Sequence, residues 1–218
     1  MTPGGHLPRH IVWDWNGTLQ DDVLAAVNGI NALLRPRGLP LVDVEKHRET
    51  FGFPVRNYYI ALGFKLELEN WDAMAVEFHR HFLNDPTTRL RPEAPSVLSS
   101  FKKAGIGMSL LSAAETETLE KLLTGYGIRG YFDNVRGLDN LSAKSKLEIG
   151  RGLVDEMGIP PEDICFIGDT DHDWEVADAL GAKCVLLTDG YQSGRRLAAC
   201  GCPLIPDLAH AVDYFGLI

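Results

Sequence analysis

Short apolar runs alternate with segments of helical periodicity through the second half of the chain. The runs read IGMSLL, ICFI, CVLL and PLI, and the helical patterns lie near residues 94–103, 115–126, 146–157, 173–180 and 208–215. Each run has the length and the continuous apolar character of a strand that is buried on both faces. Strands that alternate with helices form parallel sheets with helices on both sides. The pattern therefore predicts an α/β, Rossmann-like parallel-sheet core.

A long helical segment separates the first strand from the others. Ile11 to Trp13 is strand-like, but residues 21–88 contain only helical patterns. One helix starts at Asp21 and Asp22 and ends before Arg35-Pro36; others lie near 45–51, 58–62 and 71–82, with a break at residues 52–54. The sequence therefore predicts a core made of residues 1–20 and 89–218, with an all-α domain, residues 21–88, inserted after the first strand.

The overall charge limits the classes of partner. The chain has 218 residues, a formal net charge of -9 and no long basic run, which argues against binding to nucleic acid or to an anionic membrane. The N-terminal segment lacks the apolar core of a signal peptide, and no stretch is long enough to span a bilayer. The four cysteines fit reduced thiols, so we expect a cytoplasmic protein. We expect this protein to be a monomer or a homodimer.

Polar side chains follow three of the predicted strands. Asp14 ends the first strand, Ser112 ends IGMSLL, and Asp169 follows ICFI with Asp173 four residues later. In sheets of this kind ligands bind beyond the carboxyl ends of the strands, so these side chains are expected to share one crevice. Carboxylate and carbonyl oxygens suit a hard cation such as Mg²⁺.

A lysine at the start of the helix near 146–157 would complete a site for a phosphoryl group. Carboxylates without a cation repel one another and are costly to bury. Lys144 and Lys146 are both candidates; Lys146 is favoured because it follows Ser145 in a Ser145-x-x-Glu148 capping box. The backbone N–H groups of the Trp15-Asn16-Gly17 turn could hold phosphoryl oxygens, since glycine permits a tight turn.

Four motifs in this order closely resemble those of the haloacid dehalogenase-like (HAD) superfamily of phosphotransferases. They are DWNGTL, Ser112 at a strand end, the lysine, and GDTDHD, and they span Asp14 to Asp173. The inserted helical segment resembles the helical cap of the phosphoglycolate-phosphatase-like branch. The resemblance implies the HAD fold and a Mg²⁺-dependent phosphatase that acts on a small phosphorylated metabolite.

The resemblance also implies roles for individual residues. Asp14 resembles the nucleophile that becomes an aspartyl-phosphate. Ser112, with the N–H of Ala113 beside it, and Lys146 resemble the phosphate-binding groups. The implied Mg²⁺ ligands are Asp14, the backbone carbonyl of Asn16, Asp169 and, directly or through water, Asp173.

Asn16 departs from the family pattern, which usually has an aspartate general acid and base at this position. An amide cannot protonate a leaving alkoxide, and loss of general acid-base help costs about 10²–10⁴ in rate. Three explanations stay open. The substrate has a good leaving group such as an acyl, aryl or anhydride phosphate; another group, such as His47, His79 or His81, supplies the proton; or the protein binds phosphate and turns over little.

The helical segment is expected to set specificity by closing over the phosphoryl site. Its break at residues 52–56 is the part expected to face the crevice, and Arg56 could hold a second anionic group of the substrate. A phosphonoacetaldehyde-hydrolase-like enzyme also lacks the acid at the Asn16 position, but it needs a cap lysine, and none lies between Lys46 and Lys65. That alternative is therefore weaker than a phosphatase.

Overall fold

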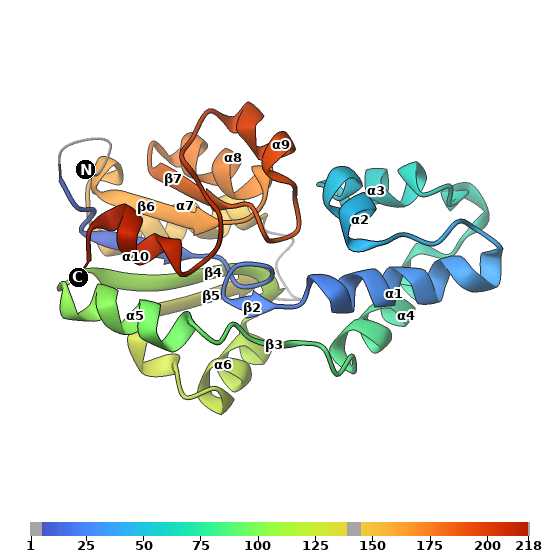
Figure 1. Cartoon of the computed structure of the whole chain (residues 1–218), viewed down its shortest axis with the longest axis horizontal. Helices are drawn as coiled ribbons and strands as arrows, with labels where there is room; N and C mark the ends of the chain where they lie inside the picture. Colours follow the sequence, from blue (N-terminus) through green and yellow to red (C-terminus); the bar gives the residue numbers. More distant parts are fainter. Residues whose placement is uncertain (1–5, 139–144, 218) are drawn as a thin grey trace.

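Six strands form one parallel sheet in the computed structural model, which describes residues 6–138 and 145–217. The strand order is β5-β4-β1-β6-β7-β8, and every neighbouring pair is parallel (Figure 1). The predicted α/β parallel-sheet fold is confirmed. The strands are β1 (His10–Trp13), β4 (Gly107–Glu115), β5 (Asn134–Leu138), β6 (Ile164–Gly168), β7 (Lys183–Leu187) and β8 (Leu204–Ile205).

Helices cover both faces of this sheet, which explains why its strands are continuous apolar runs. On β1, Ile11 and Trp13 enter one buried cluster and Val12 enters the other, as expected from the two-residue period of a strand. The first face is covered by α5 (Ala94–Lys103), α6 (Thr116–Gly125) and α10 (His210–Phe215), and the second by α7 (Lys146–Met157), α8 (Asp171–Leu180) and α9 (Gly194–Leu197).

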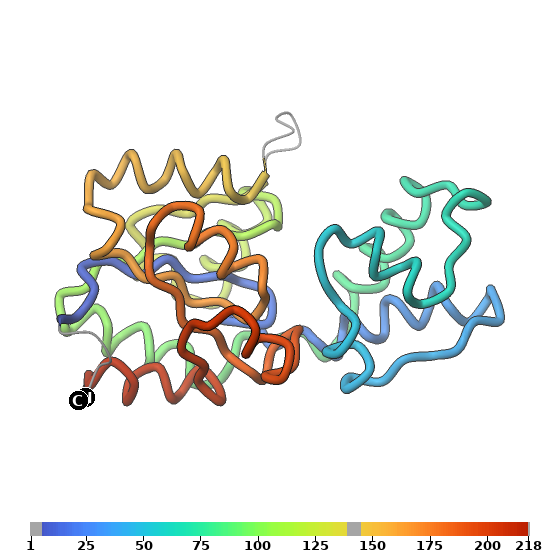
Figure 2. The backbone as a smooth tube through the Cα atoms, turned by 90° about the horizontal axis from the view of Figure 1, so that it is seen from above, coloured from blue at the N-terminus to red at the C-terminus, as the bar shows by residue number. Residues whose placement is uncertain are grey.

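The remaining four α-helices form a separate helical lobe with its own buried cluster. Figure 2 shows this lobe beside the rest of the chain. Members of its buried cluster include Leu33, Tyr58 and Met74. Two short antiparallel strands, β2 (Gln20–Asp21) and β3 (Arg89–Leu90), lie where the lobe joins the rest of the chain, the sheet lobe. The helices are α1 (Val23–Leu34), α2 (Val44–Thr50), α3 (Val55–Ala61) and α4 (Trp71–Leu83).

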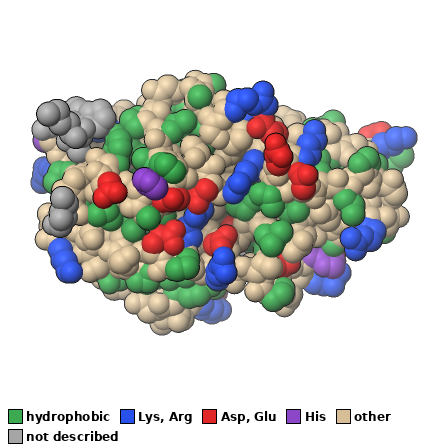
Figure 3. All heavy atoms as spheres, in the orientation of Figure 1, with side chains coloured by type: hydrophobic (Ala, Val, Ile, Leu, Met, Phe, Trp, Pro, Cys, Tyr) green, Lys and Arg blue, Asp and Glu red, His purple; other side chains and the backbone are tan. Residues whose placement is uncertain are grey.

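Polar contacts fix α2 of the helical lobe to the loop after β7. Arg48 Nε donates to the carbonyl of Gly190 at 2.8 Å, and its own carbonyl accepts from the N–H of Ser193 at 3.2 Å. Gln192 Nε2 donates to the carbonyl of Phe51 at 3.1 Å. Figure 3 shows that acidic and basic side chains are mixed on the face that it presents, where the two lobes meet. Among the described residues, none of the helices has the length and apolar character needed to cross a membrane.

Three local features differ from the sequence prediction. β5 was missed because its sequence NVRGL is only half apolar, and as the edge strand it buries only alternate residues. β4 continues to Glu115 through a register shift after Leu111, so Ser112 lies at this irregularity and not at the strand end. The first helix starts at Val23, and the Asp22 side chain makes no capping hydrogen bond because it turns toward Asn16.

Candidate active site

Asp14 and Asp169 leave the sheet side by side from the two central strands. Trp13 and Ile167 are partners in the β1–β6 register, and the N–H of Asp14 donates to the carbonyl of Ile167 at 2.9 Å. Asp173 lies in the first turn of α8, directly after β6. Carboxylate oxygens of Asp14, Asp169 and Asp173 lie within 4.8 Å of one another. The strand ends therefore bring the three predicted carboxylates together.

Lys146 joins two of these carboxylates. Its Nζ donates to Asp14 Oδ1 and to Asp173 Oδ1, at 2.6 Å in each case. The predicted capping box is present: Ser145 accepts from the Glu148 N–H, and Glu148 accepts from the Ser145 N–H. This cap starts α7 at the residue that points into the crevice. Lys144, the other candidate, lies outside the described residues.

Burial and mutual repulsion govern ionisation in this cluster. Burial raises the pKa of Asp14 to about 7, against the attraction of Lys146. Burial, together with the neighbouring carboxylates, also raises the pKa of Asp169 well above its usual range. Burial acts in the same direction on Asp173, but Lys146 and the Thr170 donors outweigh it and lower the Asp173 pKa. Three carboxylates against one ammonium leave an excess of negative charge, which a divalent cation would neutralise.

Glycines leave space for the acidic side chains. A Cβ at Gly17 would lie 2.2 Å from Asp169 Oδ2, one at Gly190 would lie 2.3 Å from Asp169 Cβ, and one at Gly168 would lie 2.3 Å from Asp173 Cγ. Gly17 also has a φ of +75°, which favours glycine. These positions therefore require glycine for two reasons, close packing and, at Gly17, backbone conformation.

Donors that the sequence prediction missed orient Asp169. Thr18 Oγ1 donates to its Oδ1 at 2.8 Å, and the N–H of Tyr191 donates to its Oδ2 at 2.6 Å. Thr18 belongs to the DWNGTL motif and could have been suspected from it. Tyr191 lies in the loop after β7, and no sequence pattern connects it with the first strand.

Asn16 is hydrogen-bonded to Asp22, a further residue that the prediction missed as part of the site. Asn16 Nδ2 donates to Asp22 Oδ2 at 2.5 Å, and the N–H of Gly17 donates to Asp22 Oδ1 at 2.9 Å. Asp22 is almost fully buried, and this burial raises its pKa to about 7. The Gly17 N–H also donates to the carbonyl of Gln20 at 3.0 Å. The Gly17 N–H therefore already has two acceptors in this structure, and the prediction that it holds a phosphoryl oxygen stays a prediction.

A cavity of about 760 Å³ lies between the two lobes, within the range of ligand sites. Asp14, Trp15, Asn16, Ser112, Ala113, Lys146 and Asp173 line its polar end. Aromatic side chains of the helical lobe line much of the rest, together with residues of the sheet lobe such as Leu122, Leu138 and Tyr191. Ser112 is buried, and its Oγ accepts from the N–H of Ala114 at 3.1 Å. A second cavity, of about 310 Å³, lies beside the amino ends of β6 and β7 and contains none of the predicted site residues.

Arg56 does not join this group. Its guanidinium lies over the ring of Trp71, with 4.9 Å from Cζ to the ring centroid, and the side chain is exposed. Trp71 lines the cavity, but Arg56 is absent from the described residues that line it. The cation–π contact stabilises this position of the guanidinium, and the prediction that Arg56 holds a second anionic group stays a prediction.

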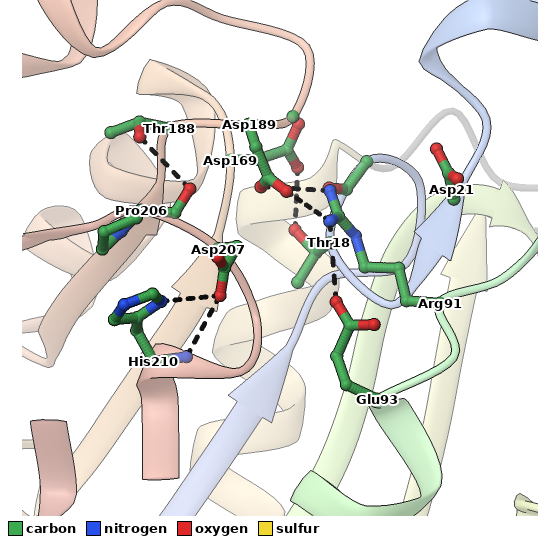
Figure 4. A network of polar contacts seen from close by, with 12 residues as sticks. Thr18, Asp21, Arg91, Glu93, Asp169, Thr188, Asp189, Pro206, Asp207 and His210 are labelled. Carbon is green, nitrogen blue, oxygen red and sulfur yellow. Dashed lines mark hydrogen bonds and ion pairs between the residues drawn. The ribbon is translucent and has the colours of Figure 1, made fainter. Parts of the chain in front are cut away.

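A buried arginine fixes the turn that carries Asn16 and Gly17. Arg91 Nη2 donates to the carbonyl of Gly17 at 2.9 Å and to Asp189 Oδ1 at 3.1 Å (Figure 4). Thr18, in the same turn, donates to Asp169, which follows the neighbouring parallel strand β6. Arg91 thus connects the segment after β3, the turn after β1 and the loop after β7, and this contact set was not predictable from the sequence.

Comparison with known proteins agrees with this geometry. A family model described as haloacid dehalogenase-like hydrolase matches residues 11–187. The chain is 30% identical over 200 residues to phosphoglycolate phosphatase 1 of Pseudomonas aeruginosa, which covers 88% of this chain and 74% of that protein. It is also 30% identical over 188 residues to a phosphoglycolate phosphatase of Aquifex aeolicus, covering 84% of this chain and 86% of that protein.

Solved structures share the fold over nearly the whole chain. A haloacid dehalogenase-like hydrolase from Streptococcus pneumoniae superposes with a TM-score of 0.80 and covers 96% of this chain and 98% of its own. Its sequence identity to this chain is 18%, so the likeness concerns the fold alone.

Proposed function

The chain belongs to the haloacid dehalogenase-like hydrolase family and is a phosphatase of that family, and we propose that it hydrolyses a small phosphorylated metabolite through an aspartyl-phosphate on Asp14. The relatives named above are phosphoglycolate phosphatases, which supports a small substrate. The observation that carries the proposal is the contact of Lys146 with both Asp14 and Asp173, at the polar end of the cavity.

The proposed cofactor is Mg²⁺. Asp14, Asp169 and Asp173 supply carboxylate oxygens close enough together for one ion, and the Asn16 carbonyl is a further candidate ligand. The bound cation would neutralise the excess negative charge and polarise the phosphoryl group. The burial of Asp14 and Asp169, which raises the pKa of both carboxyl groups, supports this proposal together with their closeness, because a bound cation would favour their ionised forms.

Each of the other residues has a proposed part in the reaction. Lys146, Ser112 and the N–H of Ala113 hold the phosphoryl oxygens, while an Asp14 carboxylate oxygen attacks phosphorus and the leaving oxygen departs with the bonding electron pair. Water then hydrolyses the aspartyl-phosphate and restores Asp14. We further propose that residues 21–88 act as a cap that excludes bulk water, in a cytoplasmic protein whose four cysteines are free thiols.

A second candidate function is a phosphate-binding protein with little turnover. The hydrogen bond from Asn16 to Asp22 favours it, because the side chain at the position of the usual acid is neutral and already bonded. The phosphonoacetaldehyde-hydrolase-like alternative is weaker, because Lys146 is the only lysine among the described residues that line the cavity.

Phosphate release from acetyl phosphate and ethyl phosphate tests the proposal. The variants are D14N and, as a matched control, D155N, which changes an exposed carboxylate on α7. We expect wild type and D155N to release phosphate only with Mg²⁺, and D14N to lose this activity. Full activity of D14N would contradict the proposal. Activity that appears only after Asn16→Asp would favour the binding protein.

A further inference from the structure

The part of the cavity beyond the carboxylates is built from aromatic side chains. Phe51, Phe53, Tyr58, Trp71, Phe78 and Phe82 line it, all from the helical lobe. They pack edge to face or stacked in neighbouring pairs, for example Phe51 with Tyr58 at 5.4 Å between ring centroids, and Phe78 with Phe82 at 5.6 Å. Flat apolar groups gain both buried area and favourable ring geometry in such a site.

Among the described residues that line it, this end of the cavity has no free lysine or arginine for a second anionic group. Arginine is absent from the described lining residues, and the one lysine, Lys146, is already bonded to two carboxylates. Two nearby arginines point elsewhere: Arg48 donates to the Gly190 carbonyl, and Arg196 donates to the Phe51 carbonyl. A substrate carboxylate buried here would therefore be destabilised.

Of the histidines in the lining, His47 does not supply that cation. Burial lowers the pKa of His47 to about 4, so its ring is neutral near pH 7. His79 Nδ1 lies 2.7 Å from the carbonyl of Ala75, and His172 Nδ1 lies 3.1 Å from Glu175.

The chemistry at Asn16 selects the leaving group. Its Nδ2 donates one hydrogen bond to Asp22, and although the amide keeps a second N–H, an amide does not give up a proton, so Asn16 cannot protonate a leaving oxygen. A phenol has a pKa of about 10, whereas water, which an alkanol resembles, is near 16. A phenolate therefore leaves without an acid much more readily than an alkoxide does.

We propose that the substrate is an aryl phosphate, whose phosphoryl group lies at the carboxylates and whose ring occupies the aromatic end of the cavity; this rests on the proposed phosphatase function. The Asp14 oxygen forms a bond to phosphorus as the bond from phosphorus to the ring oxygen breaks, and the electron pair leaves on the phenolate. Water then cleaves the aspartyl-phosphate, giving inorganic phosphate and the Asp14 carboxylate. The phenolate takes up the proton released by that water.

Four phosphate monoesters test the two parts of this proposal separately, namely the phenolate leaving group and the binding of a ring in the aromatic end of the cavity. Phenyl and benzyl phosphate both carry a ring but differ in leaving group; benzyl and ethyl phosphate both have an alkoxide leaving group but differ in the ring. The fourth, 2-phosphoglycolate, carries a carboxylate. With Mg²⁺ we expect kcat/KM for phenyl phosphate to exceed that for benzyl phosphate about 10²-fold or more. The kcat/KM for benzyl phosphate should exceed that for ethyl phosphate about tenfold, and the kcat/KM for 2-phosphoglycolate should not exceed that for ethyl phosphate.

A pair of truncations in the helical lobe tests where the ring lies. Phe53 lines the cavity and is partly exposed, so F53A should fold and should reduce kcat/KM for phenyl phosphate more than for ethyl phosphate. Ile60, on α3, is 57% exposed and lies outside the described lining, so I60A should match wild type on both substrates.

The outcomes distinguish the inference from the proposed function. Turnover that needs Asp14 but is fastest with 2-phosphoglycolate, or that is equal for benzyl and ethyl phosphate, overturns the aryl-phosphate assignment and leaves the phosphatase intact. An equal effect of F53A on phenyl and ethyl phosphate also overturns it. If neither these four esters nor acetyl phosphate gives turnover that depends on Asp14, the proposed function fails, and the inference fails with it.

Discussion

The side-chain amide of Asn16 donates a hydrogen bond of 2.5 Å to the buried carboxylate of Asp22. The pair replaces the arrangement expected for the family, in which an aspartate at the Asn16 position is free to act as acid and base. Asp22 also accepts from the Gly17 N–H, so its carboxylate stabilises the turn that follows Asp14. The Asn16 amide thus has a hydrogen-bond acceptor in Asp22, so the two residues act as a pair.

We expect Asn16→Asp alone to destabilise the protein. It would place two buried carboxyl groups in contact, and one of them would have to stay protonated. The N16D/D22N double variant exchanges donor and acceptor and should keep the hydrogen bond. Thermal unfolding at pH 8 should therefore show a loss of about 2 kcal/mol for N16D and most of it regained in the double variant. Equal stability of the two variants would show that the contact between residues 16 and 22 does not contribute to the free energy of unfolding.

The same double variant should alter catalysis, because it restores a carboxyl group at position 16. We expect its turnover of ethyl phosphate to rise by about 10²-fold over wild type, and its phosphoenzyme to be shorter-lived. Rapid-quench measurements of phosphoenzyme decay provide the check. Identical lifetimes in wild type and N16D/D22N would mean that hydrolysis of the aspartyl-phosphate does not use this position.

The core of the fold was predictable because its strands are buried on both faces. Runs such as ICFI are apolar throughout, and α7 begins at Lys146, where its Ser145 capping box predicts it. β5 was not predictable in the same way, because an edge strand with Arg136 at its centre has only alternate apolar positions. β2 and β3 have two residues each, too few for any periodicity.

The candidate site likewise contains residues that a local sequence pattern reveals and residues that it does not. Asp14, Asp169 and Asp173 could be placed together from the sequence, since they follow predicted strands of one parallel sheet. Tyr191 and Arg91 could not, because they act through a backbone N–H and a buried ion pair between distant segments. Asp22 was identified only as a helix start, because nothing in the local sequence shows that its side chain turns back toward Asn16.

Loss of Arg91 should be costly to stability. Its side chain is 8% exposed and pairs with Asp189, so Arg91→Met leaves that carboxylate and the Gly17 carbonyl without their donor. We expect a loss of about 3 kcal/mol in the free energy of unfolding, measured by urea denaturation. The control is Arg89→Met. The Arg89 side chain is 69% exposed in its pair with Asp21, so this variant should lose less than about 1 kcal/mol in the free energy of unfolding. Similar losses in both variants would contradict the role assigned to Arg91.

His47 should make the protein sensitive to acid. Burial lowers its pKa from 6.5 to about 4, so between these values the unfolded chain binds a proton that the folded chain does not. This contribution to stability is full above pH 6.5 and is lost as the pH falls toward 4; it amounts to about 2 kcal/mol between pH 7 and pH 5. Unfolding measured at both pH values should show a smaller difference for His47→Gln than for wild type. A pH dependence that is unchanged in His47→Gln, but reduced by His81→Gln at a partly exposed histidine, would refute this assignment.

The central claim is that Asp14 accepts the phosphoryl group, and trapping the phosphoenzyme tests it most directly. Wild-type protein would be mixed with Mg²⁺ and phenyl phosphate, quenched in acid during turnover, digested and analysed by peptide mass spectrometry. We predict one added phosphoryl group on the peptide that contains Asp14, localised to that residue and absent in D14N. Turnover without any phosphorylated peptide, or a phosphoryl group on another residue, would contradict the account.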